Sequence, residues 1–247
     1  MMPSLLVLYP ILSLVCFLAL PVSAWRSAVR TDAFQLPRSL SKDGGHITYD
    51  GNSVGSVREA LLATGIIPTV LDDFRPKYLL DVDWPAADAY LGNSPDIDRV
   101  DKQPKFTLFP QHYTSARAPN HTYVVTMTYP DAFPRGSHES SEMRHFVATG
   151  LPLTIPCDSA TCPKVRPPKL KVLVPYEAPD PGHGSGPYRY VFVAFAPANE
   201  STEPLQLSTP QNTLRWGRDK DKYGVQGWAA ANGLVPVAVN FIQLKNQ

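Results

Sequence analysis

The sequence predicts a mainly β protein, an antiparallel sandwich or barrel with a few short peripheral helices. Short segments rich in Val, Tyr, Phe and Thr alternate apolar and polar residues, and stretches rich in Pro, Gly, Asn and Asp separate them. Helical patterns are few and do not alternate with the strands, as they do in parallel α/β folds. The 26 prolines among 247 residues are about twice the average usage, which favours loops and short strands.

The chain opens with the features of a secretory signal peptide. Leu5–Leu20 is almost wholly apolar, and no charged side chain precedes Arg26. Val22–Ala24 supplies the small residues that a signal peptidase reads, so we expect cleavage after Ala24, removal of residues 1–24 and secretion of the rest. A signal anchor that stays uncleaved is the alternative, because no basic side chain precedes the apolar run.

One domain follows the signal peptide. Trp25–Gly45 is polar and lacks periodicity, which indicates a flexible N-terminal arm, and residues 46–247 form the predicted domain. The formal net charge of +1 combines both signs along the chain, so the sequence indicates no nucleic-acid partner. No later run of about 18 apolar residues predicts a stable membrane anchor.

The first elements of the domain are a short strand, a helix and a turn. His46–Tyr49 has the composition of a strand. Ser56–Glu59 matches a capping box, so we expect a helix to begin there, to continue through Leu62 and to stop at Gly65. Ile67–Leu71 follows as a second short turn.

The rest of the domain is predicted to be strands with one late helix. The helix spans Val225–Asn232 and ends at Gly233. Long irregular segments at Gly136–Glu142, Pro156–Lys169 and Pro175–Pro187 are where we expect a functional site, since such loops are often functional. The predicted strands are Tyr78–Trp84, Lys105–Pro110, Tyr123–Tyr129, His145–Thr149, Leu170–Pro175, Tyr188–Phe195 and Val235–Leu244.

Two short motifs resemble catalytic signatures but lack the context that the chemistry needs. Gly51–Gly55 matches Gly-x-Ser-x-Gly, yet a hydrolase of that type requires a parallel sheet, so we interpret the segment as a turn leading into the helix. His138 and His145 are seven positions apart, which does not fit the His-Glu-x-x-His spacing of a zinc site. The sequence therefore predicts neither a metal nor a cofactor.

The remaining cysteines and two sequons are compatible with secretion. Cys16 leaves with the signal peptide, whereas Cys157 and Cys162 are close enough in sequence to form a local disulfide in an oxidising compartment. Asn120 and Asn199 begin Asn-x-Thr and Asn-x-Ser tripeptides, and we expect both to be surface glycosylation sites.

Three segments place polar groups at strand edges beside loops: Met127–Arg135, Ser141–Val147 and Gly182–Phe192. The second contains His145, a lone imidazole within an apolar strand, and the first contains Asp131, a carboxylate able to orient a histidine. A lone strand histidine is more often structural than functional, so the residues alone leave both interpretations open.

The third segment is rich in glycine. Gly184 and Gly186 free the backbone N–H groups to point at an anion, although glycine-rich segments are more often simple turns.

Together these segments resemble the two signature regions of the phosphatidylethanolamine-binding protein family. The family pattern is Asp-Pro-Asp-Ala-Pro-Ser-Arg, a Glu-x-x-His strand, and later Gly-x-Gly-x-His-Arg-Tyr-Val-Phe. Glu59–Pro68 resembles the family's N-terminal helix and Ile-Pro turn, and Gly233–Phe241 resembles its C-terminal strand. The resemblance extends from about His46 to the end of the chain. Trp216–Asn240 is most similar to secreted members from filamentous fungi.

The resemblance implies a β-sandwich with a small anion pocket near one end, which holds phosphate, acetate or a phospholipid head group in the family. Asp131, His145 and Tyr190 match its walls. Gly184 and Gly186 match its glycine-rich rim.

Two wall positions differ from the family pattern. Tyr129 replaces the first Asp and Tyr188 replaces the second His, while Phe133 is an insertion. A different register aligns Asp131 with the first Asp instead. Because tyrosine adds apolar area and one hydrogen-bonding group, we expect a larger or less charged ligand than phosphate. Arg135, Arg144 and Arg189 either contact that ligand or pair with structural carboxylates.

Three functions follow from the resemblance, and whether the protein is an enzyme stays open. The first is a secreted protein that binds a small anionic or carbonyl-bearing ligand. The second is an enzyme or accessory factor, with a protein partner, that assists the dimerisation of maleic-anhydride monomers into fungal maleidride or phomoidride metabolites. There His145, oriented by Asp131, is the candidate base, and Tyr188 or Tyr190 donates to an enolate oxygen. The third is a secreted protease inhibitor that uses Trp25–Gly45.

Overall fold

The computed structural model describes one compact unit within Ala33–Gln247. Asn199, one of the two predicted glycosylation sites, is exposed and lies in the turn that follows the strand ending at Pro197. Its side-chain oxygen accepts a hydrogen bond from the Ser201 amide. No helix among the described residues is long and apolar enough to cross a membrane. The described residues are 53–110, 122–132, 142–154, 169–181, 186–209, 215–216 and 224–245. The predictions outside them concern the signal peptide, the arm 25–45, the strand 46–49, the disulfide Cys157–Cys162, Asn120, His138 and Gly184.

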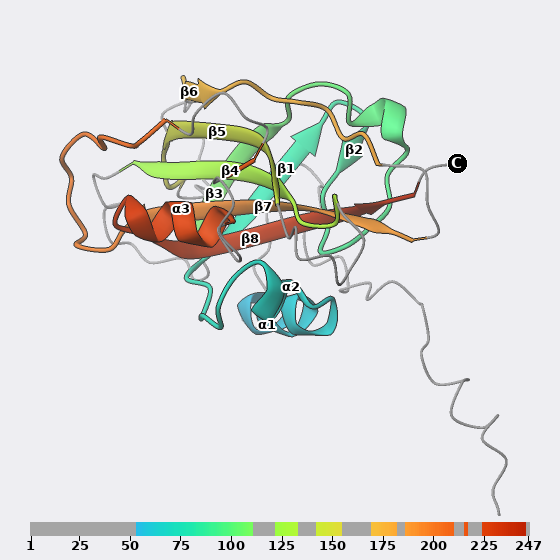
Figure 1. The fold of residues 1–247 in the computed structure, drawn as a ribbon, viewed down its shortest axis with the longest axis horizontal. Coiled ribbons are helices and arrows are strands. Elements are labelled where there is room, and N and C mark those ends of the chain that lie inside the picture. Colours follow the sequence, from blue (N-terminus) through green and yellow to red (C-terminus); the bar gives the residue numbers. More distant parts are fainter. Residues whose placement is uncertain are drawn as a thin grey trace, which may run out of the picture. The chain divides into compact units, whose positions relative to one another are not determined.

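The described strands form two antiparallel sheets (Figure 1). The three-stranded sheet has the order β2 (Ala87–Asp88), β1 (Tyr78–Trp84), β3 (Lys105–Pro110). The five-stranded sheet has the order β6 (Lys171–Val174), β5 (Met143–Leu151), β4 (Tyr123–Tyr129), β7 (Tyr188–Pro197), β8 (Leu234–Leu244). Every pair of these strands is antiparallel, which confirms the predicted fold class. A nucleophile elbow requires a parallel sheet, and these strands do not form one.

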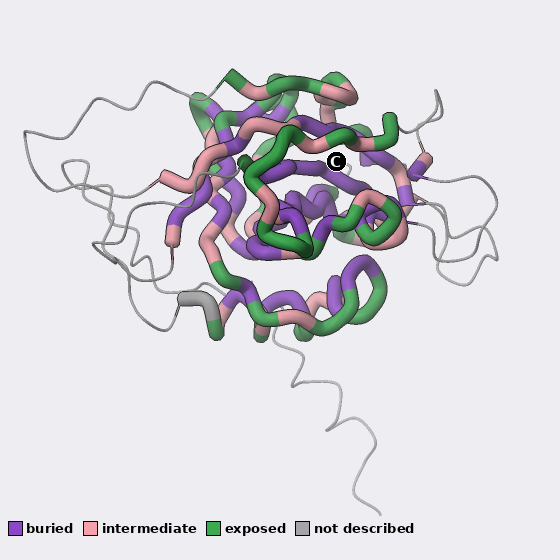
Figure 2. The backbone as a smooth tube through the Cα atoms, turned by 90° about the vertical axis from the view of Figure 1, so that its left-hand side faces the viewer, coloured by how far each residue is buried: buried purple, intermediate pink, exposed green. Residues whose placement is uncertain are grey.

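The five-stranded sheet is covered on both faces, which explains why all seven residues of β4 are buried. Tyr123, Val125 and Met127 belong to the core between the two sheets, together with residues of β1 and β3. Val124 belongs to a second core on the opposite face. This alternation follows from the two-residue period of a strand, and Figure 2 shows the buried stretches inside the sandwich.

Helices form the layer over the second face. Val57 and Leu61 of α1 (Ser53–Ala63) and Trp228 of α3 (Val225–Ala231) pack in the second core with Val193 of β7. The short α2 (Ile66–Thr69) adds Ile66 to that core, and Figure 1 shows α1 and α2 beside β8. A 3₁₀ turn, η2 (Ile97–Arg99), lies in the connection between β2 and β3.

Most predicted elements are confirmed, and the differences have physical reasons. β1, β3 and β4 have the predicted bounds, whereas β5 extends two residues further at each end than predicted. The capping-box prediction is wrong, because α1 begins at Ser53 and Ser56 lies inside the helix. Val57 and Leu61 on its apolar face pack in the second core, which stabilises the helix through tertiary contacts. β2 has only two residues, too few to leave a period in the sequence.

A buried asparagine joins the two sheets near β8. Asn240 donates from Nδ2 to the carbonyls of Leu80 (2.9 Å) and Ala89 (2.8 Å), and its Oδ1 accepts from the Leu91 amide (3.0 Å). The next segment passes so close to β8 that a Cβ on Gly92 would lie 2.6 Å from Phe241. These contacts fix β1 against β8 and therefore hold the two layers of the sandwich together.

Candidate functional site

A β-bulge in β5 aims His145 toward the other sheet. Met127 of β4 pairs with Phe146, but Thr128 pairs with Arg144, so His145 is the extra residue of the bulge. Phe146 lies in the core between the sheets, and the imidazole of His145 contacts aromatic rings of the same face. A bulge re-aims a side chain that strict alternation would send to the other face.

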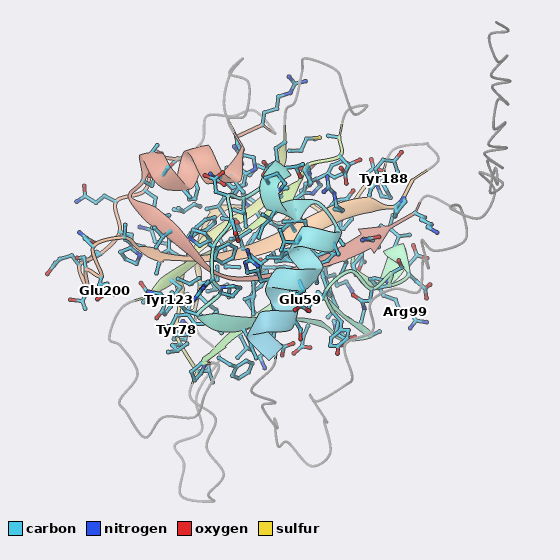
Figure 3. All side chains as sticks on the ribbon, turned by 90° about the horizontal axis from the view of Figure 1, so that it is seen from below. Glu59, Tyr78, Arg99, Tyr123, Tyr188 and Glu200 are labelled. Atoms are coloured by element: carbon cyan, nitrogen blue, oxygen red, sulfur yellow. The ribbon has the colours of Figure 1, made fainter. Side chains whose placement is uncertain are left out.

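Four rings from three neighbouring strands meet at this end of the sandwich, and we call Tyr129, His145, Tyr188 and Tyr190 the aromatic cluster. The Tyr129 and Tyr190 rings are stacked with centroids 4.7 Å apart. The imidazole of His145 meets the Tyr190 ring edge to face at 5.3 Å. Tyr188 meets Tyr129 at 6.0 Å and is half-buried at the start of β7, where Figure 3 labels it. The structure therefore brings the rings of four predicted site residues together.

Two polar atoms of the aromatic cluster are buried without a hydrogen-bond partner among the described residues. They are Nε2 of His145 and the hydroxyl of Tyr190, on side chains whose residues are 3% and 0% exposed. Most buried polar groups in proteins are paired, and an unpaired one costs about 1–3 kcal/mol. Such a cost concentrated at one place marks a position where a further group is expected to bind.

The other nitrogen of His145 defines the tautomer. Nδ1 lies 3.0 Å from the backbone carbonyl oxygen of Glu177, which can only accept a hydrogen bond. Nδ1 therefore carries the hydrogen, and the neutral imidazole presents a lone pair at Nε2. Burial lowers the pKa of His145, and the carboxylates of Glu177 and Asp180 oppose this shift. The neutral, accepting form is thus favoured near neutral pH.

The Tyr190 phenol is also neutral. Burial raises its pKa above the ordinary range of tyrosine, and Tyr129 adds to this effect. The nearby backbone amide of Asp180 lowers the pKa, although it does not meet hydrogen-bond geometry with the hydroxyl. The phenol can both donate and accept one hydrogen bond.

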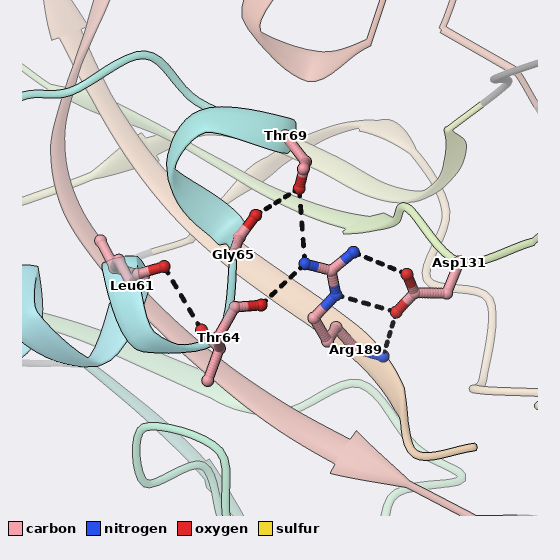
Figure 4. Close-up of polar contacts among 6 residues, drawn as sticks. All are labelled: Leu61, Thr64, Gly65, Thr69, Asp131 and Arg189. Atoms are coloured by element: carbon pink, nitrogen blue, oxygen red, sulfur yellow. Dashed lines mark hydrogen bonds and ion pairs between the residues drawn. The ribbon is translucent and has the colours of Figure 1, made fainter. Parts of the chain in front are cut away.

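Asp131 does not orient His145, so that part of the sequence prediction is wrong. Its carboxylate accepts two bonds from the Arg189 guanidinium, Nε at 2.9 Å and Nη2 at 2.6 Å, and a third from the Arg189 backbone amide at 2.8 Å (Figure 4). Nη1 of Arg189 donates to the carbonyl of Thr64 at the end of α1 (2.9 Å). A bidentate carboxylate–guanidinium pair is stronger than a bond to imidazole, which explains the choice of partner.

The pair supports the aromatic cluster from the opposite face of the sheet. Asp131 follows β4 two residues after Tyr129, and Arg189 lies between Tyr188 and Tyr190 on β7. The bonds between them therefore fix the strand ends that carry three of the four rings. Of the other predicted arginines, Arg144 donates to the Arg215 carbonyl (3.3 Å), and position 135 lies outside the described residues.

A second polar network on the helix-covered face was missed by sequence reasoning. The buried carboxylate of Glu142 accepts hydrogen bonds from the Thr128 hydroxyl (2.5 Å) and from the Val225 amide at the start of α3 (3.1 Å). Trp216 donates from Nε1 to the same hydroxyl (2.8 Å). Burial raises the pKa of Glu142 to about 7. The available signal was the Glu of the Glu-x-x-His match.

The glycine rim is described only in part. Gly186 lies two residues before Tyr188, is half-buried, and has open space where a Cβ would point. Gly184 lies outside the described residues, so its predicted role stays a prediction.

Comparison with known proteins gives consistent matches. The sequence profile described as phosphatidylethanolamine-binding protein matches residues 89–242. The chain is 28% identical over 196 residues to carboxypeptidase Y inhibitor of Saccharomyces cerevisiae, covering 72% of this chain and 89% of that protein. A crystal structure of carboxypeptidase Y inhibitor complexed with its cognate proteinase matches with a TM-score of 0.62 at 23% identity, over 78% of this chain and 97% of that one. Phosphatidylethanolamine-binding protein from Plasmodium vivax matches with a TM-score of 0.54 at 19% identity, over 76% and 97%.

Proposed function

Because the chain belongs to the phosphatidylethanolamine-binding protein family, we propose that it binds a small anionic or carbonyl-bearing ligand at the aromatic cluster. The observation that carries this proposal is the pair of buried, unpartnered polar atoms, Nε2 of His145 and the hydroxyl of Tyr190. Their rings are in edge-to-face contact, with centroids 5.3 Å apart, so the two atoms belong to neighbouring side chains. A ligand that bonds to both recovers the free energy lost by burying them unpaired.

The ligand class follows from the surrounding side chains. Tyr129 and Tyr188 contribute two further rings, so the walls are largely aromatic. Arg189, the cation carried by the same strand, is already bonded to Asp131. A planar acid or carbonyl compound fits these walls better than a multiply charged anion, since aromatic faces stack on planar groups and do not neutralise charge.

Ligand titration of the full chain tests the proposal. We expect acetate or benzoate to give saturable binding and phosphate to bind more weakly. Tyr190→Phe should weaken benzoate binding about tenfold, which is the loss of one hydrogen bond of about 1.4 kcal/mol. The control is Tyr123→Phe, which removes a hydroxyl from an equally buried tyrosine that is bonded to Tyr78 instead. Equal affinity of the two variants, or no saturable binding to the wild type, contradicts the proposal.

A peptidase inhibitor is the second candidate, and the 28% identity to carboxypeptidase Y inhibitor is the observation that favours it. An inhibitory surface need not involve the aromatic cluster, so Tyr190→Phe should leave inhibition unchanged. Inhibition of a carboxypeptidase by chains with and without residues 25–45 provides the test. If neither chain inhibits the carboxypeptidase, this candidate function is excluded.

A further inference from the structure

We propose that the aromatic cluster binds an acidic group together with one proton, so that anion binding is coupled to proton uptake. This inference rests on the proposed function, since it concerns the same site, and it adds the ionisation state of the ligand. It predicts that the bound group is a neutral carboxylic acid, or an anion facing a protonated His145.

The argument begins with the hydrogens that the cluster already holds. Nδ1 of His145 uses its hydrogen on the Glu177 carbonyl, so Nε2 has only a lone pair to offer. The Tyr190 hydroxyl has one hydrogen and lone pairs. The two unpartnered atoms therefore need one donor and one acceptor from the ligand.

A fully ionised carboxylate does not satisfy this requirement. It accepts from Tyr190, but its second oxygen would face the lone pair of His145 Nε2, and two acceptors repel one another. The acid form donates its O–H to Nε2 while its carbonyl oxygen accepts from Tyr190. Protonation of His145 gives the same bonds with the proton on nitrogen. In both cases one proton passes from solvent to the complex, and no covalent bond changes.

The charges around His145 agree with this requirement. From β4 and β7 it faces the neutral phenols of Tyr129 and Tyr190. From the segment after β6 it faces the carboxylates of Glu177 and Asp180, which raise its pKa against the larger lowering by burial. An arriving anion is therefore repelled by carboxylates on that side, and a proton supplies the compensating charge.

Matched ligand pairs test the coupling. Benzoate and acetate are acidic probes, and benzamide and acetamide are neutral counterparts that already present an N–H donor and a carbonyl acceptor. We expect the carboxylates to bind about tenfold more weakly for each pH unit above neutrality, which corresponds to uptake of one proton. The amides should bind with the same affinity across that pH range. Calorimetry in two buffers of different ionisation enthalpy counts the protons directly.

The outcomes separate this inference from the proposed function. Carboxylate binding that does not depend on pH and takes up no proton overturns the coupling while leaving the site intact. If neither the acids nor the amides bind, the proposed function fails and the coupling with it. His145→Gln places an amide at this position, which can donate to an anion. We expect this variant to bind benzoate with proton uptake near zero, and wild-type-like uptake contradicts the assignment to His145.

Discussion

Two tyrosines at opposite ends of the sandwich are equally buried but differ in their polar contacts. Tyr123 and Tyr190 are both 0% exposed, and burial raises the pKa of each phenol. The Tyr123 hydroxyl is bonded to the Tyr78 hydroxyl at 3.2 Å, whereas the hydroxyl of Tyr190 has no bond to any described residue. Figure 3 shows Tyr123 beside Tyr78 and far from Tyr188, which marks the aromatic end.

The two hydroxyls differ because only that of Tyr123 has a hydrogen-bond partner among the described residues, Tyr78; the unpaired atoms of the aromatic end lie beside a further one, Nε of Arg144 on β5. Where a buried tyrosine serves packing alone, the fold supplies a partner for its hydroxyl, as at Tyr78. At Tyr190 and His145 the same core leaves two atoms unpaired, while the Asp131–Arg189 pair behind them is extensively hydrogen-bonded. The Asp131–Arg189 pair therefore contributes to stability, whereas the cluster in front of it is where we propose that a ligand binds.

Disrupting the Asp131–Arg189 pair, which supports the aromatic cluster, should have the largest effect on stability. Asp131→Ala leaves the guanidinium of Arg189 unpaired, and both side chains are 9% exposed. We expect the free energy of unfolding to fall by about 3–5 kcal/mol, because loss of one partner leaves a buried charge uncompensated. Urea unfolding measures this change.

Asp96→Ala is the matched control for that variant. Asp96 pairs with Arg99 at 3.0 Å, but the two side chains are 61% and 55% exposed, and Asp96 makes no side-chain capping bond. We expect a loss below about 1 kcal/mol. Similar losses for the two variants would show that burial of the Asp131–Arg189 pair contributes nothing.

The Glu142 network makes the stability of the helix-covered face sensitive to pH. The Thr128 hydroxyl has one hydrogen but lies within reach of two acceptors, Glu142 Oε1 at 2.5 Å and the Met143 carbonyl at 3.0 Å. A protonated Glu142 donates to Thr128, which then donates to Met143, so the neutral acid satisfies both contacts. The folded pKa of about 7 lies above the ordinary value of 4.5.

Stability from this group is therefore complete below pH 4.5 and is lost as the pH rises through 7. We expect Glu142→Gln to remove about 2–3 kcal/mol of this pH dependence, measured as the difference from wild type in urea unfolding between pH 4.5 and 8. Glu203→Gln, at an exposed carboxylate, should leave the profile unchanged. A wild-type profile in the Glu142→Gln variant would mean that Glu142 ionises normally.

Removal of one hydroxyl at each end tests the comparison directly. Tyr123→Phe deprives Tyr78 of a partner and should cost about 1 kcal/mol. Tyr190→Phe removes a hydroxyl that has no bond, so the free energy of unfolding without ligand should stay the same or rise by up to about 1 kcal/mol. A greater loss in Tyr190→Phe than in Tyr123→Phe would show that the Tyr190 hydroxyl is paired after all.

Much of the fold was predictable because it depends on local pattern. The period of two defines β1 at Tyr78–Trp84, and the family resemblance orders the segments that carry Tyr129, His145 and Tyr190. The residue composition of a strand does not depend on how it pairs with its neighbours. The strands could therefore be predicted without knowing which strand pairs with which.

The details that determine the chemistry depend on tertiary structure. A bulge shifts the register by one residue, and nothing in the composition around His145 indicates it. The bond between Arg189 and Asp131 joins residues 58 positions apart. The sequence left open that Arg189 pairs with a structural carboxylate, but it suggested the imidazole of His145 as the partner of Asp131. Glu142 was predicted only as the last residue of an irregular segment, and its burial was not, since glutamate is rarely buried.

The smallest expected effect comes from the outermost contact of the support. Thr69 accepts from Nη1 of Arg189 at 3.4 Å and is exposed, whereas the same nitrogen donates to the Thr64 carbonyl at 2.9 Å. Thr69→Val also removes the bond that the Thr69 hydroxyl donates to the Gly65 carbonyl (2.5 Å), but both bonds are made by an exposed side chain. We therefore expect the free energy of unfolding to fall by only about 0.5–1 kcal/mol and benzoate affinity to stay unchanged. If this variant weakens benzoate binding as strongly as Tyr190→Phe does, the support and the aromatic cluster act as one unit, and the distinction between them fails.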